Sequence, residues 1–326
     1  MIEISGSALL ASLLAGAAPI LLATLGETIT ERAGVINLSL DGTILLGAMT
    51  AFAVACSTGS LAAGYLAAGA VGAFLAGIVA ATSLYWKVSQ VAVGFVLTLM
   101  AKDLAYFLGN PYVRLHGPSS PSRAVPFLRD VPFFGTVLFD HPLPVYFSMV
   151  FIFLCWWYLY RTSWGLELRA VGENPRASHA RGIDPKRLRM AYALAGGMVV
   201  GFSGAVFSLC VKPGWGRPQG AEGTGWIALA LVIFGGWHPF RAALGAYLFA
   251  FLQIMGIHLQ GWFPSVPAQV FQVAPFPLMI FTLLALNLGR KEPALSPPLK
   301  GKWAASFRRP FSVSMPSSLG RPLDLE

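Results

Sequence analysis

The sequence predicts an all-α fold, a polytopic bundle of about eight or nine transmembrane helices. Hydrophobic residues make up 56% of the chain and charged residues only 11%, whereas about a quarter of the residues are charged in an ordinary soluble domain. The mean hydropathy is +0.64. A helix needs about 20 apolar residues to cross a bilayer, and several apolar runs reach that length. A soluble protein with a large buried core would need more polar surface than this composition provides.

We expect a transmembrane helix in each of the long apolar runs. These runs are 7–29, 40–58, 60–86, 88–109, 143–160, 190–210, 241–262 and 270–289. A further piece at 225–236 would reach only about 18 Å as a helix, against about 30 Å for the hydrocarbon core. This piece is therefore expected to be a short or broken helix. The transmembrane permeation domain would cover 1–290, and the basic tail 291–326 is expected to be cytoplasmic and disordered.

Basic residues predict the orientation of the chain. Seven of the 23 Lys and Arg lie in 161–189, and seven more lie in 290–326, that is, in the tail and at the residue before it. Positive residues concentrate on the cytoplasmic side, so an even number of crossings must separate these two segments, and 225–236 has to cross as well. Counting back places the N-terminus outside and the C-terminus in the cytoplasm. Arg32, Lys87 and Arg241 then also lie inside, which gives 17 positive residues inside and five outside.

A polar segment, ERAGVINLSLDG, joins the first two spans. Polar residues at membrane depth are rare, and they face a protein interior or a water-filled path. Glu31, Asn37 and Asp41 are therefore expected near a solute path, on non-helical backbone that protein or water surrounds. Glu27 lies four residues before Glu31, so the two carboxylates would repel each other, and Arg32 is the expected counter-charge. An ordinary cytoplasmic turn with a Glu–Arg pair is the alternative.

A second loop, KPGWGRPQGAEGTGW, is rich in Gly and Pro and leads into the short apolar piece. Its glycines permit close approach of the backbone to a neighbour. Glu222 is expected near the solute path, because it is polar and precedes a break between helices. Trp215 and Trp226 either stack on a ring of the solute or lie in the aromatic belt of the membrane interface.

The most distinctive polar segment is LRAVGENPRASHARGIDPKRLRM, between two apolar runs. Asn174 followed by Pro175 is typical of a helix start, and Gly182 fits the C-cap. These signals predict a short helix of about two turns. The small residues Ala177 and Ala180 would lie on a face that can enter a groove of another protein. A simple solvated loop is the alternative.

Signatures of catalysis and metal binding are missing from the sequence. It has no P-loop, HExxH or GxSxG motif. The three Cys lie singly in apolar runs and the five His are far apart, so no catalytic residue, metal site or cofactor is predicted. The basic residues are spread over many turns, which does not indicate nucleic-acid binding. If ATP drives this protein, another chain has to hydrolyse it.

Three blocks resemble the membrane permease subunit of ABC-type importers, in the group of ribose, simple-sugar, nucleoside and branched-chain amino-acid permeases. ERAGVINLSLDGTILLGAMTAF (31–52) resembles the early motif of this family, and its first five residues are closest to the simple-sugar/nucleoside branch. LRAVGENPRASHARGI (168–183) resembles the cytoplasmic coupling loop, and GTGWIALALVIFGGWHPFRAALGAYLFAF (223–251) resembles the late motif. The resemblance covers about residues 8–290.

The resemblance implies a division of labour among several chains. A periplasmic or lipid-anchored binding protein would deliver the solute, and cytoplasmic ABC ATPase subunits would dock on the coupling loop, 161–189. Two permeases would rock between outward-open and inward-open states, and a heterodimer is favoured over a homodimer. The chain would be a multi-pass protein of the bacterial or archaeal inner (plasma) membrane. The residues implied in ATPase coupling are Gly172, Glu173, Asn174, Pro175, Ala177, Ala180 and Gly182.

The sequence thus predicts a permease that translocates a nucleoside or a simple sugar. One departure from the family is that Ser178 and Arg181 stand where small apolar residues are common, which implies a cognate ATPase. An ion-coupled secondary transporter is the alternative function, and it would show inverted halves and an ion site in the membrane. An integral-membrane enzyme would need clustered His, Asp and Glu near one face, and we find no such cluster in the sequence.

Overall fold

The computed structural model describes residues 6–263 apart from 127 and 130, single residues between 266 and 281, and residues 315–321 and 323. The chain forms two units, one of Met1–Tyr247 with Pro316–Glu326 and one of Leu248–Met315. Seven helices in the described part are long and apolar enough to cross a membrane. This confirms the predicted polytopic helical bundle, and the span expected at 270–289 lies almost entirely outside the described residues.

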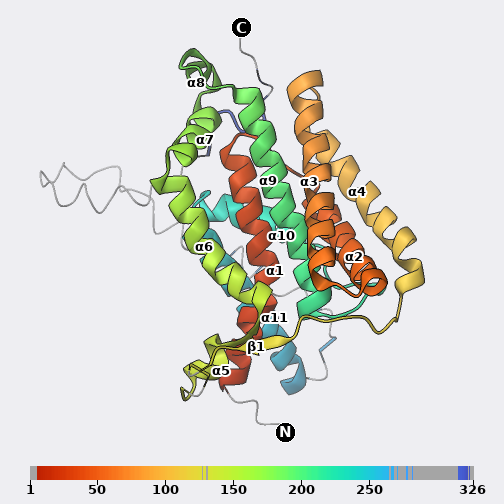
Figure 1. Cartoon of the computed structure of the whole chain (residues 1–326). Coiled ribbons are helices and arrows are strands. Elements are labelled where there is room, and N and C mark those ends of the chain that lie inside the picture. The colour runs from red at the N-terminus through yellow and green to blue at the C-terminus, as the bar shows by residue number, and fades with distance from the viewer. Residues whose placement is uncertain are drawn as a thin grey trace, which may run out of the picture. The chain divides into compact units, whose positions relative to one another are not determined.

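The long helices follow the predicted apolar runs closely (Figure 1). Their bounds are α1 (Gly6–Arg32), α2 (Leu40–Thr58), α3 (Leu61–Trp86), α4 (Gln90–Gly109), α6 (Leu143–Arg161), α9 (Pro185–Val206) and α11 (Pro239–Trp262). The shorter elements are η1 (Asn110–Tyr112), β1 (Ser122–Ala124), α5 (Phe134–Leu138), β2 (Asp140–Pro142), α7 (Ser163–Glu173), α8 (Pro175–Ala180), η2 (Phe207–Val211) and α10 (Thr224–Gly235). Strands β1 and β2 pair antiparallel.

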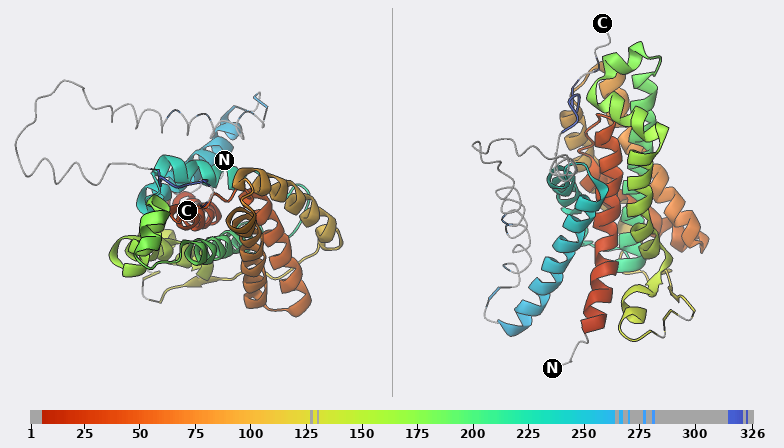
Figure 2. Two further views of the ribbon diagram at one scale, coloured as in Figure 1. Left: turned by 90° about the horizontal axis from the view of Figure 1, so that it is seen from above. Right: turned by 90° about the vertical axis from the view of Figure 1, so that its left-hand side faces the viewer.

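Within the first unit, the short elements mark the two ends of the bundle. Figure 1 shows α7 and α8 at one end, and α5 with β1 at the other. We call these the α7–α8 end and the α5 end. The views of Figure 2 show that α1 runs through the bundle along its whole length. Helix α9 starts at the α7–α8 end and runs back beside α1 (Figure 1).

Local sequence sets where several helices begin. Ser60 precedes α3, and its hydroxyl accepts a hydrogen bond from the N–H of Ala63 at 3.3 Å. Asp184 precedes α9, where Pro185 takes the first helical position, and its carboxylate accepts the N–H groups of the next two residues at 3.0 and 3.3 Å. Such caps satisfy N–H groups that have no partner inside the helix.

Helix α9 packs against α1, α2 and α3 through glycines. A Cβ atom on Gly72 of α3 would overlap the carbonyl oxygen of Gly197, and one on Gly26 of α1 would lie 2.7 Å from the oxygen of Gly196. A Cβ on Gly47 of α2 would lie 2.7 Å from the oxygen of Gly201. Small residues let helix backbones approach this closely in membrane proteins.

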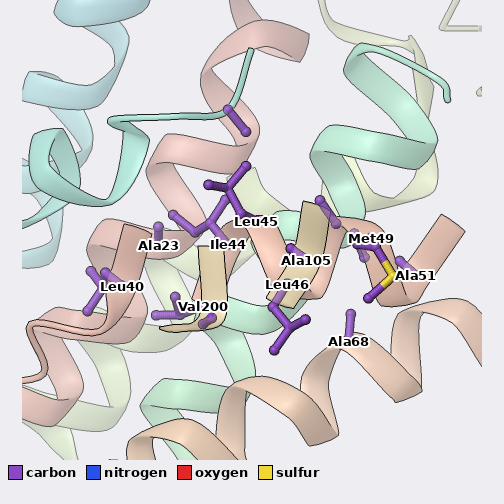
Figure 3. Packing of buried hydrophobic residues seen from close by; sticks show 14 of the residues in the cluster. Ala23, Leu40, Ile44, Leu45, Leu46, Met49, Ala51, Ala68, Ala105 and Val200 are labelled. Atoms are coloured by element: carbon purple, nitrogen blue, oxygen red, sulfur yellow. The ribbon is translucent and has the colours of Figure 1, made fainter. Parts of the chain in front are cut away.

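The apolar core lies among α2, α3, α4, α9 and α10, with one contribution from α1. Figure 3 shows side chains of the cluster interdigitating between these helices, including Leu40, Ile44 and Leu45 of α2 and Ala23 of α1. Large apolar side chains also cover the outside of the bundle. Examples are Leu66, Phe74, Phe95, Phe107, Phe153 and Trp157, each more than half exposed or close to it. An apolar exterior of this extent fits a surface in contact with lipid.

Candidate functional site

The connection between α1 and α2 is non-helical and buried in protein. Residues 33–39 are not assigned to a helix, and most of them are buried. Side chains of other helices satisfy the backbone of this connection, as buried backbone requires. Ile36 N–H donates to Gln90 at 2.7 Å, Asn37 N–H donates to Glu27 at 2.9 Å, and the Leu38 carbonyl accepts from Thr98 at 2.7 Å. The backbone of this connection is therefore buried and paired, as non-helical backbone inside a protein has to be.

The two glutamates of α1 lie inside this region without the predicted counter-charge. Glu31 accepts a hydrogen bond from the indole N–H of Trp237. Arg32 instead donates to the carbonyl oxygen of Trp237 at 3.0 Å and to the hydroxyl of Tyr160 at 3.1 Å. The prediction that Arg32 offsets Glu27 and Glu31 is therefore wrong among the described contacts. Arg32 ends α1, and its side chain extends to the α10–α11 connection and to α6.

Asp41 joins the first turns of α2 and α10. Its carboxylate accepts the N–H of Gly225 at 3.1 Å, and Asp41 is almost fully buried. A Cβ atom on Gly225 would overlap the backbone of Asp41, so only glycine permits this approach. A helix N-terminus carries unpaired N–H groups and a partial positive charge. The carboxylate therefore lies where the positive ends of two helices meet.

Helix α10 is short, as predicted for 225–236, and a glycine bounds it at each end. It spans Thr224–Gly235, and the glycines before and after it, Gly223 and Gly236, have φ of 84° and 64°. Positive φ is readily adopted only by glycine. Twelve residues reach about 18 Å, so the helix begins at Asp41, inside the bundle, and ends beside the side chain of Arg32.

Glu222 lies three residues before Gly225 and organises the loop that precedes α10. Its carboxylate accepts the N–H groups of Gln219 at 2.9 Å and Gly220 at 2.6 Å, and the hydroxyl of Tyr106. Burial by itself raises the pKa of Glu222, but the Tyr106 hydroxyl and these N–H groups outweigh it and hold that pKa below its usual value. The side chain is therefore a carboxylate at neutral pH.

Aromatic and cationic groups surround this loop. The ring of Trp215 lies 5.7 Å from that of Tyr106, and the guanidinium of Arg217 lies 4.9 Å from the Tyr106 ring on its face. A cavity of about 330 Å³ beside them is lined by Trp215, Lys212, Gln219 and Arg114, among others. Sequence reasoning missed Tyr106, because it lies in the middle of an apolar run, where an isolated Tyr carries no distinguishing signal.

Trp226 lies apart from this cluster. It is partly exposed on α10, and its ring contacts Phe95 of α4 at 6.3 Å between centroids. The described contacts thus bring together Glu222 with Tyr106 and Asp41 with Gly225. Trp226 is on the outer side of the same helix start.

The segment that the family resemblance implies in ATPase coupling forms two helices at the α7–α8 end. Helix α8, Pro175–Ala180, begins as predicted, with the Asn174 side chain accepting the N–H of Ala177 at 3.0 Å. Gly182 follows it with φ of 86°. Helix α7, Ser163–Glu173, was not predicted, although Gly165, Leu168 and Val171 are buried at a helical spacing. That apolar spacing was the signal that could have found it.

The implied coupling residues divide into a buried anchor and an exposed face. Gly172 is buried, and a Cβ atom on it would overlap the carbonyl oxygen of Arg32 at the end of α1. Ala177, Ala180 and Gly182 are exposed, and Pro175 is half-buried. A groove of about 430 Å³ on this surface is lined by residues of both helices and the turn after them, namely Leu166, Glu167, Ala170, Glu173, Asn174, Ala177, Ser178, Arg181 and Ile183.

A family model for the branched-chain amino acid transport system permease component matches residues 9–283. The chain belongs to this family. Among relatives of the permease, TsgC13 of Haloferax volcanii, named as a glucose ABC transporter permease protein, is 36% identical over 74% of each chain. The guanosine ABC transporter permease protein NupQ of Bacillus subtilis is 30% identical over 88% of this chain and 94% of its own. The nucleoside ABC transporter permease protein NupC of Lactococcus lactis is 29% identical over 90% and 95%.

No solved structure matches the permease. These relatives fall in the simple-sugar/nucleoside branch that the early motif indicated. A permease component of an ABC transporter is a multi-pass protein of the plasma membrane and not itself an enzyme, because the ATPase is a separate subunit. The described residues hold no group of three or more His, Cys, Asp or Glu that could bind a metal ion.

Proposed function

We propose that this permease translocates a nucleoside or a simple sugar, which an extracytoplasmic binding protein delivers, and that a cytoplasmic ATPase drives it. The observation that carries the proposal is the contact between Gly172 and the carbonyl oxygen of Arg32. It joins the exposed α7–α8 surface, where an ATPase would dock, directly to the end of α1. Glu31, the residue before Arg32, is among the proposed path residues, so movement of the docking helices reaches the path through a backbone contact.

The chemistry of the proposed path suits a neutral solute with several hydroxyl groups. Asp41 and Glu222 present carboxylate oxygens at the start of α10, and carboxylates accept hydrogen bonds from hydroxyls. Asn37 and Glu31 extend this polar lining toward the α7–α8 end. The relatives named for guanosine, nucleosides and glucose transport solutes that share a hydroxylated sugar ring. If alanine at all four positions left uptake kinetics unchanged, this path would be wrong.

The α7–α8 end is proposed to face the cytoplasm, with the N-terminus outside. The basic residues of 161–189 support this orientation through the positive-inside rule. Labelling tests it: a single cysteine at His179, which is exposed on α8, should react with a membrane-impermeant thiol reagent only in inside-out vesicles. Labelling in intact, right-side-out cells would instead show that the α7–α8 end faces outward.

A second, different permease is proposed as a partner. Bacillus subtilis and Haloferax volcanii each contribute two similar permeases, NupP with NupQ and TsgB13 with TsgC13. The exposed face of α4 supports such a partner. Asp103 is exposed about 20 Å along this helix, and a carboxylate facing lipid at that depth is costly. A partner permease that covers α4 removes this cost.

Reconstitution of the complete transporter tests the proposal. The permease, its partner permease and the ATPase are placed in liposomes with the binding protein, and uptake of labelled guanosine, other nucleosides and glucose is measured with and without ATP. We expect saturable uptake of one of these classes that requires ATP and persists when ionophores collapse ion gradients. Uptake driven by an ion gradient without ATP would support the secondary transporter instead, and no ATP-dependent uptake of either class would overturn the proposal.

A further inference from the structure

A segment near the C-terminus packs against the α7–α8 end of the first unit. We call Pro316–Arg321 together with Leu323 the C-terminal clasp. Pro316, Ser318 and Leu323 are buried, and two turn hydrogen bonds, Leu319 N–H to Pro316 O and Arg321 N–H to Ser318 O, keep the clasp compact. The clasp lies in the basic tail 291–326, of which the structure describes 315–321 and 323.

The clasp binds the end of α7. Ser318 donates from its N–H and its hydroxyl to the carbonyl oxygen of Gly172, at 3.1 and 2.6 Å. Ser317 donates from its N–H and its hydroxyl to the carboxylate of Glu173, at 3.1 and 2.8 Å. The last carbonyls of a helix have no partner inside it. The clasp therefore caps α7 at the two residues that lead into α8.

The clasp also binds α9 through a buried arginine. The guanidinium of Arg189 donates to the Ser318 hydroxyl at 2.6 Å, and Arg189 is 1% exposed. The same guanidinium lies against Gly34, where a Cβ atom would come within 2.7 Å of it. Ser318 thus connects α7 and α9 through one hydroxyl group. A charged side chain buried in this way depends strongly on its polar partners.

The remaining contacts of the clasp reach the connection before α2. Gly320 N–H lies 3.4 Å from the carbonyl oxygen of Gly34. Leu323 packs in a small apolar cluster with Val35, Ala80, Leu84 and Ala193, which belong to the α1–α2 connection, α3 and α9. The clasp therefore touches the docking helices and the start of the proposed path at the same time.

Resting on the proposed function, we propose that the C-terminal clasp is a coupling element, which fastens the ATPase-docking helices α7 and α8 to α9 and to the α1–α2 connection. Gly172 gives a backbone contact between α7 and the end of α1. The clasp adds polar contacts to Gly172, Glu173 and Arg189, and an apolar anchor at Leu323. A movement that the ATPase imposes on α7 and α8 is then transmitted to the α1–α2 connection, where the proposed solute path starts. Without the clasp, bending at the junction of α7 and α8 would absorb this movement.

Variants of the clasp in the complete reconstituted transporter test this inference. The readouts are uptake of the transported solute and ATP hydrolysis in the same vesicles. In a chain ending at Met315, and in Leu323→Asp, uptake per ATP hydrolysed should fall about fivefold or more, while ATP hydrolysis stays within about twofold of wild type. Ser318→Ala should give a smaller loss. Arg321→Ala is the matched control, because this exposed side chain belongs to the same segment, and it should match wild type.

Unchanged or increased uptake per ATP in the shortened chain overturns the inference, since an inhibitory tail would give the increase. If the shortened chain fails to insert into the membrane, cross-linking of the full-length chain provides a second test. In a background without native cysteines, the pair Ser317→Cys and Glu173→Cys should cross-link in the intact complex, and absence of the cross-link also overturns the inference. A wild-type complex without ATP-dependent uptake would instead contradict the proposed function itself.

Discussion

The carboxylate of Asp41 accepts the N–H of Gly225 at 3.1 Å across 184 residues of sequence. Because Asp41 lies in the first turn of α2 and Gly225 in the first turn of α10, a side chain at the start of one helix caps the start of another. The two chain breaks that sequence analysis treated separately, before α2 and before α10, are therefore one place in the folded protein.

Replacing Asp41 separates its capping role from its charge. Asp41→Ala removes the acceptor for Gly225, and the loss of a helix cap costs about 1 kcal/mol, which lowers the Tm by about 1–2 °C in a chain of this length. Asp41→Asn keeps an acceptor and should retain most of the Tm. Thermal unfolding in detergent checks this. If uptake nevertheless falls in both variants, the charge acts on the solute; equal Tm in all three proteins would contradict the capping role.

Filling the groove between α7 and α8 should block the ATPase. Ala177 is exposed and lines the groove, so Ala177→Trp should weaken co-purification of the ATPase subunit about tenfold or more. His179→Trp is the matched control, because His179 is exposed on the same helix but does not line the groove. Quantitative pull-down from membranes measures both. Unchanged co-purification of the ATPase with Ala177→Trp would place the docking surface elsewhere.

His238 should make the protein sensitive to acid. Burial, together with the nearby positive charges of Arg241 and Arg32, lowers the pKa of His238 to about 4. The unfolded chain takes up this proton near pH 6.5, so the unfolded state gains stability as the pH falls from about 6.5 toward 4. The Tm of His238→Asn should therefore fall less over this interval than the Tm of wild type. Parallel Tm losses in His238→Asn and wild type would show that His238 does not contribute.

The exposed face of α4 should contact the second permease. Phe107 is 77% exposed on α4, and Trp157 is 55% exposed on α6. In a background without native cysteines, Phe107→Cys should cross-link to the partner permease through a short bifunctional reagent, and Trp157→Cys should not. Asp103→Leu should reduce recovery of the pair. Cross-links from α6 in place of α4 would assign the interface to the other side of the bundle.

Local features of the fold were predictable because their causes are local. Apolar runs of sufficient length predicted the long helices, and the 12-residue piece predicted the short α10. Asn174 and Pro175 predicted the start of α8, since a side-chain cap and a fixed φ act within one turn. Helix α7 is harder to predict, because its charged residues hide the helical spacing of its buried positions Leu168 and Val171.

The partners of the polar groups could not be predicted in the same way. Arg32 was paired with its sequence neighbours Glu27 and Glu31, but it bonds to Trp237, 205 residues further along the chain. Ser318 and Arg189 likewise meet only after folding. A hydrogen-bond partner is chosen by which helices pack together, and one sequence contains no direct record of that packing. The sequence pattern therefore identified the polar residues at the helix breaks but not their hydrogen-bond partners.

The glycine contacts of α9 determine which parts of this protein are free to move. A helix whose main chain touches three neighbours has no side-chain layer that could repack, so it cannot roll or slide without separating from all of them. We therefore expect helices α1, α2, α3 and α9 to move as one rigid group. Any rearrangement during transport would then fall on elements outside this group, including the backbone at Gly223 and Gly236 on either side of α10.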